Sequence, residues 1–152
     1  MSKIKKSCSE EIHKHLTLEY RKSLMKLEME VFQARQTRMT DKVQRYFNST
    51  PIRNAFARWM VCAFYENEYY TISRLVNEMR TNRQTVSVMV SECESENYIV
   101  VQRKGKTVAC QASAILVKKM DDYSDWRKEL IKRTIEQSYN NLIDFETIMN
   151  LI

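Results

Sequence analysis

Apolar residues recur at mostly helical spacing over the N-terminal third of the chain, and polar residues fill the positions between them. This periodicity predicts a long helix over residues 9–47. A capping box, formed by Ser7 with Glu10 three residues later, is expected to open it. The helix is longer than most globular helices, so we expect it to pack against more than its own small core. Its apolar members are Ile12, Leu16, Leu24, Leu27, Val31 and Met39.

A second apolar stripe begins at the only proline of the chain. Thr50 suits the N-cap of a helix and Pro51 its first position, where the missing N–H of proline costs nothing. The pattern predicts a buried helix over residues 51–66, followed by a polar break. Thr71 is then expected to cap a short helix that runs to about Arg80. The inward positions of the buried helix are Ile52, Phe56, Trp59, Met60, Ala63 and Phe64.

The stretch TNRQTVSVMVSECESENYI predicts another short helix directly afterwards, with Thr81 and Gln84 as its capping box. Its apolar residues fall on one face at positions i, i+3, i+4 and i+7. The helix has arginine at its start and glutamates at its end, although the helix macrodipole favours the opposite order. The inward positions are Val86, Met89, Val90 and Cys93, and the outward ones are Arg83, Gln84, Ser87 and Ser91.

The segment YIVVQRKGKTVAC predicts a β-hairpin, because β-branched residues flank Lys104 and Gly105. Gly105, the only glycine, supplies the left-handed position that the turn needs. Ser113 is expected to cap a final helical segment that continues to the end, with an interruption near Asp121 and Asp122. The order of elements predicts a mostly α fold with a small β-hairpin wing, a winged helix-turn-helix flanked by long N- and C-terminal helices.

The reversed charge order of the second short helix is explained if its N-terminal half enters the major groove of DNA. Positive charge at a helix start costs up to about 1 kcal/mol, whereas a good base contact contributes about 1–3 kcal/mol. Arginine pairs with guanine and glutamine with adenine, so Arg83, Gln84 and Ser87 are the candidates for reading bases. The alternative for these residues is ordinary surface polarity. The far end of the helix, away from the phosphates, then holds Glu92, Glu94 and Glu96.

Basic and polar residues on either side of this helix are candidates for binding phosphates. Those of the hairpin have an alternative role as a charged edge that prevents strand pairing between molecules. The candidates are Arg103, Lys104 and Lys106 in the hairpin, and Thr71, Ser73 and Arg74 at the start of the preceding helix.

The segments ISRLVNEMRTNRQTVSVMVSECESENYI and VVQRKGKTVACQAS resemble the MarR-type family of bacterial transcription regulators, with a likeness in element order over about residues 10–152. The resemblance implies a single domain over residues 1–152, with a winged-helix DNA-binding core at residues 51–112. It also implies a homodimer joined through the segments 9–47 and 123–152. The implied function is that of a sequence-specific double-stranded DNA-binding transcriptional regulator that acts as a repressor.

The same resemblance implies two further features. Some MarR-type proteins bind a small aromatic effector, and Tyr65, Tyr69 and Tyr70 could line such a pocket near the dimer junction, with core packing as the alternative. Others sense peroxides through a cysteine near the start of the first helix. Cys8 is therefore a redox-sensing candidate, and the alternative is an unremarkable thiol on a frayed terminus. Arg80 stands where the family usually has glycine in the turn before the recognition helix.

Composition and charge favour the same class of partner. The 152-residue chain has a formal net charge of +6 and a pI near 9.2. A basic protein of this kind suits a polyanion such as nucleic acid or an anionic membrane surface. No apolar run approaches the roughly 20 residues that span a bilayer, and the N-terminus lacks the apolar core of a secretory signal. We therefore expect a cytoplasmic protein without a membrane partner.

The sequence offers no motif for catalysis, a cofactor or a metal. It lacks a nucleophile elbow, a phosphate loop and a glycine-rich cofactor fingerprint, so we expect no enzyme and no cofactor. Its cysteines form no C-x-x-C pair, and His13 and His15 fall on different faces of a helix. Two other classes remain: a winged-helix protein-interaction module without DNA binding, and a helical scaffold without a helix-turn-helix. Salt-dependent binding to duplex DNA tests the first, and a hairpin between two helices excludes the second.

Overall fold

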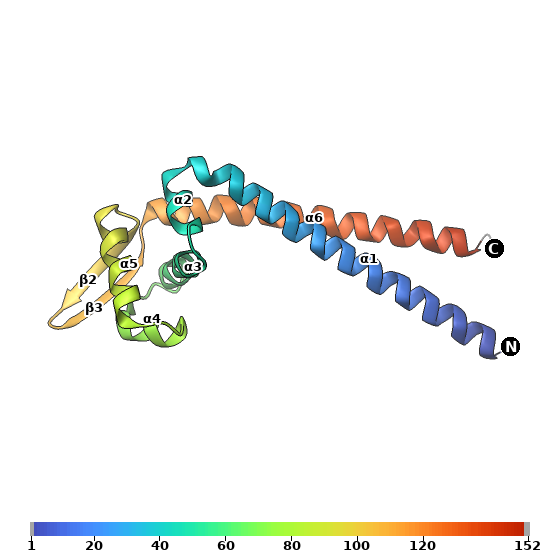
Figure 1. Cartoon of the computed structure of the whole chain (residues 1–152), viewed down its shortest axis with the longest axis horizontal. Helices are drawn as coiled ribbons and strands as arrows, with labels where there is room; N and C mark the ends of the chain where they lie inside the picture. Colours follow the sequence, from blue (N-terminus) through green and yellow to red (C-terminus); the bar gives the residue numbers. More distant parts are fainter. Residues whose placement is uncertain (1, 151–152) are drawn as a thin grey trace. The chain divides into compact units, whose positions relative to one another are not determined.

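The computed structural model describes the backbone of residues 2–150 and the side chains of residues 9–138 and 140. These residues fall into two compact units. One unit combines the N-terminal residues up to Ala34 with those from Asp125 onward, and the other spans Arg35–Ser124. Figure 1 shows the elements of both units coloured along the sequence.

The first unit is a pair of long helices. It contains most of α1 (Ser2–Thr37) and the larger part of α6 (Ala114–Asn150). Leu27 and Val31 of α1 are buried together with Leu130 of α6. Each helix therefore contributes one apolar stripe to the contact, as amphipathic helices do when they pack along their length.

The second unit is a winged helix-turn-helix. The sheet is antiparallel, with β3 (Thr107–Ala112) between β1 (Tyr70–Thr71) and β2 (Ile99–Lys104). β2 and β3 form a hairpin between α5 (Arg83–Ser95) and α6. The predicted fold class is confirmed, and the hairpin excludes the helical scaffold. The elements are a 3₁₀ helix η1 (Arg38–Thr40), α2 (Lys42–Asn48), α3 (Pro51–Tyr65), β1 (Tyr70–Thr71), α4 (Ile72–Glu78), α5 (Arg83–Ser95), β2 (Ile99–Lys104) and β3 (Thr107–Ala112), followed by the start of α6.

One apolar core holds this unit together. Phe56 and Met60 of α3, Leu75 of α4, Val86 of α5 and Cys110 of β3 are all fully buried in it. The residues that the sequence placed on the inward face of α5 are buried here. The opposite face of α5 is thereby turned outward, which is the orientation that a recognition helix needs.

The prediction of a single helix over residues 9–47 is wrong. α1 ends at Thr37, and after the η1 turn Asp41 adopts an extended backbone with φ −77° and ψ 130°. Asp41 caps α2, since its carboxylate accepts a hydrogen bond from the Gln44 backbone N–H at 2.9 Å. Lys119 of α6 binds the same carboxylate at 2.6 Å and holds the pKa of Asp41 below its usual value. The cap and its ion pair therefore separate α1 from α2, although the apolar periodicity had predicted one continuous helix.

The other expected helix caps are partly confirmed. Thr50 caps α3 and Thr71 caps α4, each accepting a backbone N–H from three residues later. α5 is capped by Asn82 rather than by Thr81, because the Asn82 side chain accepts the Thr85 backbone N–H at 2.8 Å. Asparagine is as good an N-cap as threonine, so the sequence pattern allowed both positions.

The long terminal helices also differ from their predicted bounds. α1 already begins at Ser2, so the predicted start at residue 9 with Ser7 as its cap is wrong. α6 begins directly after Ser113, but the buried Ser113 hydroxyl has no hydrogen-bond partner among the described residues and therefore caps nothing. α6 continues through Asp121 and Asp122 without the expected interruption.

Arg80 occupies the left-handed backbone region between α4 and α5, with φ 51°. That conformation costs a residue with a Cβ about 1–2 kcal/mol, whereas glycine there costs about 0.5–1 kcal/mol of unfolded-chain entropy. We expect Arg80→Gly to raise the free energy of unfolding by about 0.5–1 kcal/mol, measured from the urea midpoint. Asn97→Gly is the matched control at φ 58°, and it should gain less because asparagine tolerates this region. A loss of stability in Arg80→Gly would contradict the strain.

Candidate nucleic-acid interface

The first turns of α5 display the three residues predicted to read bases. Arg83 and Gln84 are exposed and Ser87 is half-buried. Arg83 and Ser87 are four residues apart, so they share one face of the helix, and Gln84 lies beside them. The Asn82 cap fixes where the helix begins and therefore which residues this turn presents. The structure thus brings the three side chains together on one outward turn.

The start of α4 is joined to this turn by one long contact. The Arg83 guanidinium donates to the Ser73 hydroxyl at 3.4 Å, so Ser73 and Arg83 lie side by side on the surface. Thr71 is half-buried, and its hydroxyl is occupied by the α4 cap. Of these two hydroxyl groups, Ser73 is the better placed to meet a phosphate.

Arg74, the third phosphate candidate of α4, is already held in place. Its guanidinium donates to Glu78 at 2.7 Å and to Glu68 at 2.9 Å, and it lies 3.6 Å from the centre of the Tyr70 ring. The same guanidinium, with the Trp59 indole N–H, holds the pKa of Glu78 below its usual value. Two carboxylates neutralise Arg74, which weakens the case for a phosphate contact.

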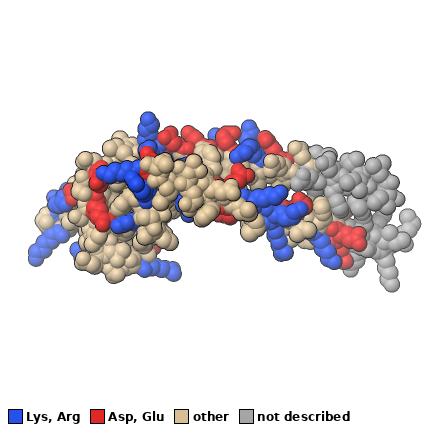
Figure 2. Space-filling view, turned by 45° about the horizontal axis from the view of Figure 1, so that its top comes forward, with Lys and Arg blue, Asp and Glu red and all other residues tan. Residues whose placement is uncertain are grey.

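The hairpin presents its cations in two different ways. The Arg103 guanidinium forms a bidentate pair with the Glu94 carboxylate of α5, at 2.7 and 2.6 Å. Lys104 and Lys106 are exposed, and no carboxylate among the described residues pairs with either. Basic side chains project from the second unit at the end where Figure 1 places the hairpin tip (Figure 2). Gly105 turns the chain between them with φ 58°, as expected.

The acidic end of α5 has a role that the sequence did not predict. Each of its three glutamates binds a cation from a different element, so this end of the helix ties α2, α3 and β2 together. Placing the glutamates away from the phosphates was therefore an incomplete explanation of the charge order. The pairs are Glu92 with Arg53 at 2.9 Å, Glu94 with Arg103 at 2.6 Å and Glu96 with Lys42 at 2.5 Å, and the Tyr46 hydroxyl also donates to Glu92 at 2.6 Å.

The three tyrosines proposed to line an effector pocket lie in different surroundings. Tyr70 is buried in the core, where its hydroxyl donates to Glu66. Tyr65 is exposed and its hydroxyl donates to Asp121, while Tyr69 is half-buried. A separate polar hollow of about 290 Å³ is lined by Thr37, Arg38, Thr40, Asp41, Gln44, Lys119, Asp122 and Tyr123.

The side chain of Cys8 lies outside the described residues. Cys93 and Cys110 are free and buried, and burial raises the pKa of each thiol to about 12, which keeps both protonated and unreactive. The described residues contain no group of three or more His, Cys, Asp or Glu that could hold a metal ion. Among the described helices, none has the length and apolar character to cross a membrane.

Comparisons with known proteins identify the architecture. No protein-family model matches the sequence, and no curated protein matches it. Solved structures do match. MepR, a transcription regulator of the Staphylococcus aureus multidrug efflux pump MepA, has a TM-score of 0.54 at 12% identity, over 82% of this chain and 92% of its own. The S. aureus MepR–DNA complex gives 0.54 at 12% identity over 80% and 97%, and the transcriptional regulator Tm0710 from Thermotoga maritima gives 0.50 at 13% identity over 84% and 91%.

The chain has a MarR-type fold. Within this MarR-type fold, α4 and α5 form the helix-turn-helix and β2 and β3 form the wing. Identities of 12–13% establish the fold alone.

Proposed function

We propose that the protein is a sequence-specific double-stranded DNA-binding transcriptional regulator that acts as a homodimeric repressor. The observation that carries the proposal is the outward turn of α5, where Arg83, Gln84 and Ser87 stand together beside a basic hairpin. MepR shares the fold and has been solved with DNA, which supports the same use here. The net charge of +6 suits a polyanionic partner.

Base reading falls to α5 in this proposal. The planar guanidinium of Arg83 can donate two hydrogen bonds to guanine, and the Gln84 amide can pair with adenine. The present contact of Arg83 with Ser73 is long, at 3.4 Å, so little is lost when the guanidinium turns to a base. Ser87 lies one turn further along and can donate to or accept from either base.

Phosphate binding falls mainly to the exposed lysines of the wing. Lys104 and Lys106 flank the hairpin turn, which follows α5 in the sequence. Ser73 belongs to α4, which precedes α5. Arg74, Arg103 and Thr71 complete the proposed set, although all three already have partners within the protein. Phosphate contacts fix the position of α5 on the duplex without reading its sequence.

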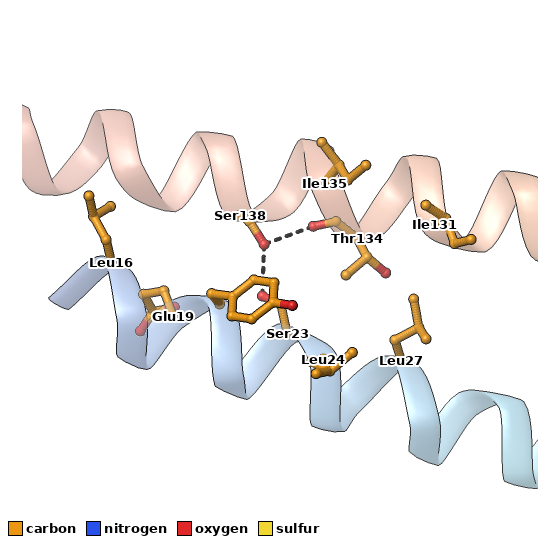
Figure 3. A pocket seen from close by; sticks show the side chains of 10 residues that line it. Leu16, Glu19, Ser23, Leu24, Leu27, Ile131, Thr134, Ile135 and Ser138 are labelled. Atoms are coloured by element: carbon orange, nitrogen blue, oxygen red, sulfur yellow. Dashed lines mark hydrogen bonds between the residues drawn. The ribbon is translucent and has the colours of Figure 1, made fainter. Parts of the chain in front are cut away.

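A second copy of the chain is the proposed partner of the first unit. α1 exposes an apolar stripe away from its contact with α6, and an apolar groove of about 420 Å³ lies between the two helices. In Figure 3, Ser23 and Ser138 are hydrogen-bonded across this groove. Exposed apolar surface of this extent marks an interface. The stripe consists of Leu18, Met25, Met29 and Phe32, and the groove is lined by Leu16, Tyr20, Leu24, Leu27, Ile131 and Ile135, among others.

Repression follows if the dimer occupies a palindromic operator and blocks access to a promoter. A small aromatic effector belongs to the same proposal. The polar hollow beside α2 is its candidate site, because it holds the Arg38 guanidinium and the aromatic ring of Tyr123, whereas its other cation, Lys119, is already paired with Asp41. The guanidinium of Arg38 lies 5.3 Å from the centre of that ring.

The alternative is a winged-helix protein-interaction module that does not bind DNA. The observation that favours it is the neutralisation of Arg74 and Arg103, which removes two of the expected phosphate contacts. Affinity for duplex DNA that falls steeply with salt supports the regulator, because phosphate contacts release counterions. No salt-dependent duplex binding supports the module.

Lys106→Ala tests the phosphate contact of the wing. In a dimer the substitution removes two contacts, so the slope of log affinity against log salt should flatten by about 2 × 0.9, or roughly 1.8. Affinity for preferred and scrambled duplexes should fall alike, because phosphates carry no sequence information. Lys118→Ala, an exposed lysine at the start of α6, is the control and should leave the slope unchanged. An unchanged slope in Lys106→Ala would remove Lys106 from the interface.

A further inference from the structure

The basic residues of the wing lie on two different faces of the hairpin. Opposite residues of an antiparallel pair point to the same side, and neighbours along a strand alternate. Ile99 and Val101 of β2 pack toward the core, so Arg103 occupies the next inward position of the same strand. Lys104 falls on the outward face. The register therefore separates two adjacent basic residues that look equivalent in the sequence.

The outer end of the wing has few contacts with the rest of its unit, since Val108 is partly buried against the core and the residues beyond it are exposed. β1 pairs with β3 only at Cys110 and Ala109. The last two rungs, Arg103 with Val108 and Lys104 with Thr107, have no third strand beside them. A two-stranded hairpin without further packing is marginally stable in water. The side-chain contact that ties this end to α5 is the bidentate pair of Arg103 with Glu94.

We propose that Glu94 is a positioning residue for DNA binding, which holds the wing against α5 through Arg103, while the wing's phosphate contacts are made by Lys104 and Lys106. This inference rests on the proposed function, and it changes the role of Arg103 from a DNA contact to an internal anchor. Both oxygens of Glu94 and both terminal nitrogens of Arg103 are used in the pair, so the geometry is fixed in direction as well as distance.

The two roles of Arg103 predict opposite effects for the removal of Glu94. If Arg103 anchors the wing, Glu94→Ala loosens the hairpin and weakens binding. If Arg103 binds phosphate, Glu94→Ala releases a competing cation and removes a negative charge near DNA, so binding becomes tighter and its salt slope steeper. The sign of this single change separates the two roles.

The first experiment measures duplex affinity over a salt series for Glu94→Ala and Arg103→Gln. For an anchor, each variant should bind the preferred duplex more weakly by up to about fivefold per protomer, the ceiling for an exposed ion pair, and so by up to about 25-fold for the dimer, with a nearly unchanged salt slope. The double variant should be no weaker than either single one, because both remove the same contact. Tighter binding by Glu94→Ala, or a slope flattened by about 1.8 in Arg103→Gln, would overturn the proposal.

The second experiment reverses the pair. The double variant Glu94→Arg with Arg103→Glu keeps an ion pair between α5 and β2 but moves the positive charge off the wing. An anchor predicts that affinity returns to within about twofold of the parent, since only the pairing matters. A phosphate contact predicts no recovery, because a glutamate on the wing repels DNA.

Amide hydrogen exchange of residues 103–108 tests the anchor without DNA. These amides should exchange faster in Glu94→Ala than in the parent chain, because opening of the hairpin becomes easier. Glu96→Ala is the matched control: it removes the pair with Lys42 at the same end of α5 and should leave the wing unchanged. Unchanged exchange in Glu94→Ala overturns the inference even where the parent binds DNA. Failure of the parent chain to bind duplex would instead refute the proposed function, and the exchange result would still decide the anchor.

Discussion

Arg83→Ala will relax the sequence preference of DNA binding more than it weakens binding to random duplex. The Arg83 side chain is exposed on the outward turn of α5, and its one described contact is the long hydrogen bond to Ser73. Each bidentate contact with guanine contributes about 1–3 kcal/mol of discrimination. A dimer contains the residue twice, so the preferred site should lose about 2–6 kcal/mol.

Gln84→Ala should have an effect of the same size at a different base. The amide of glutamine matches adenine, whereas the guanidinium matches guanine, so each substitution should relax its own position in the site. Selection of bound duplexes from a random pool, repeated for each variant, reads this out directly. Half-sites should retain every preference except the one that the missing side chain supplied.

Arg45→Ala is the control for the loss of charge alone. Arg45 is an exposed arginine in the last turn of α2, away from the outward turn of α5. It should change neither the selected sequence nor the affinity beyond a small electrostatic effect. If Arg83→Ala and Lys106→Ala both weaken all duplexes equally, then α5 does not read bases. If neither variant changes binding, the helix-turn-helix does not contact DNA.

The fold could be predicted from the sequence because its boundaries carry local signals. Thr50 and Pro51 mark the start of α3, Thr71 marks the start of α4, and the only glycine lies at the hairpin turn. These residues act through their own backbone geometry or through a hydrogen bond three residues away. Such signals do not depend on how distant parts of the chain pack.

The break between α1 and α2 was missed although a local signal for it existed. Asp41 followed by Gln44 is itself a capping pattern. The apolar residues Met39, Val43 and Phe47 are spaced four apart across it, so the helical period continues through the break. Periodicity reports the spacing of apolar residues, and it does not record a backbone turn that keeps this spacing.

The base-reading turn could be predicted from one element, whereas the ion pairs depend on how two elements pack. Arg83, Gln84 and Ser87 belong to one helix, so the buried face of that helix places all three. Arg103 and Glu94 lie on different elements, and their meeting depends on the register of the hairpin. Arg53 and Glu92 are 39 residues apart. A sequence pattern gives the face of one element but not the contact between two, so these partners could be found only in the structure.

Charge substitutions in the exposed stripe of α1 should convert the protein to a monomer. At about 100° per residue, Met25 and Phe32 lie on one side of α1, and Leu27 lies on nearly the opposite side. Leu27 is 8% exposed beside α6, whereas Met25 and Phe32 are 57% and 59% exposed. A helix with apolar residues on two sides is expected to pack between two partners, and the described contacts supply only one of them.

The variant that tests this carries Met25→Glu and Phe32→Glu together. Burial of each side chain contributes about 1.5–3 kcal/mol, and a symmetric dimer buries two copies of each. The double variant should therefore lose about 6–12 kcal/mol of association free energy. Sedimentation at micromolar concentration should show a dimer for the parent chain and a monomer for the variant. The winged-helix unit of the variant should stay folded and unfold in urea as it does in the parent chain, because its core contains neither residue.

Lys26→Glu controls for charge reversal on the same helix, since Lys26 is exposed between the two substituted positions and outside the apolar stripe. It should remain dimeric. The monomeric variant should also bind a palindromic duplex much more weakly and with about half the salt slope, because one copy engages one half-site and half the phosphates. If the double variant stays dimeric, the stripe is not the interface. If the parent chain is itself a monomer, and the double variant binds a palindrome with the same salt slope as the parent, the proposed homodimer is wrong. The assignment of α5 as the reading helix would then rest on the selection experiment alone.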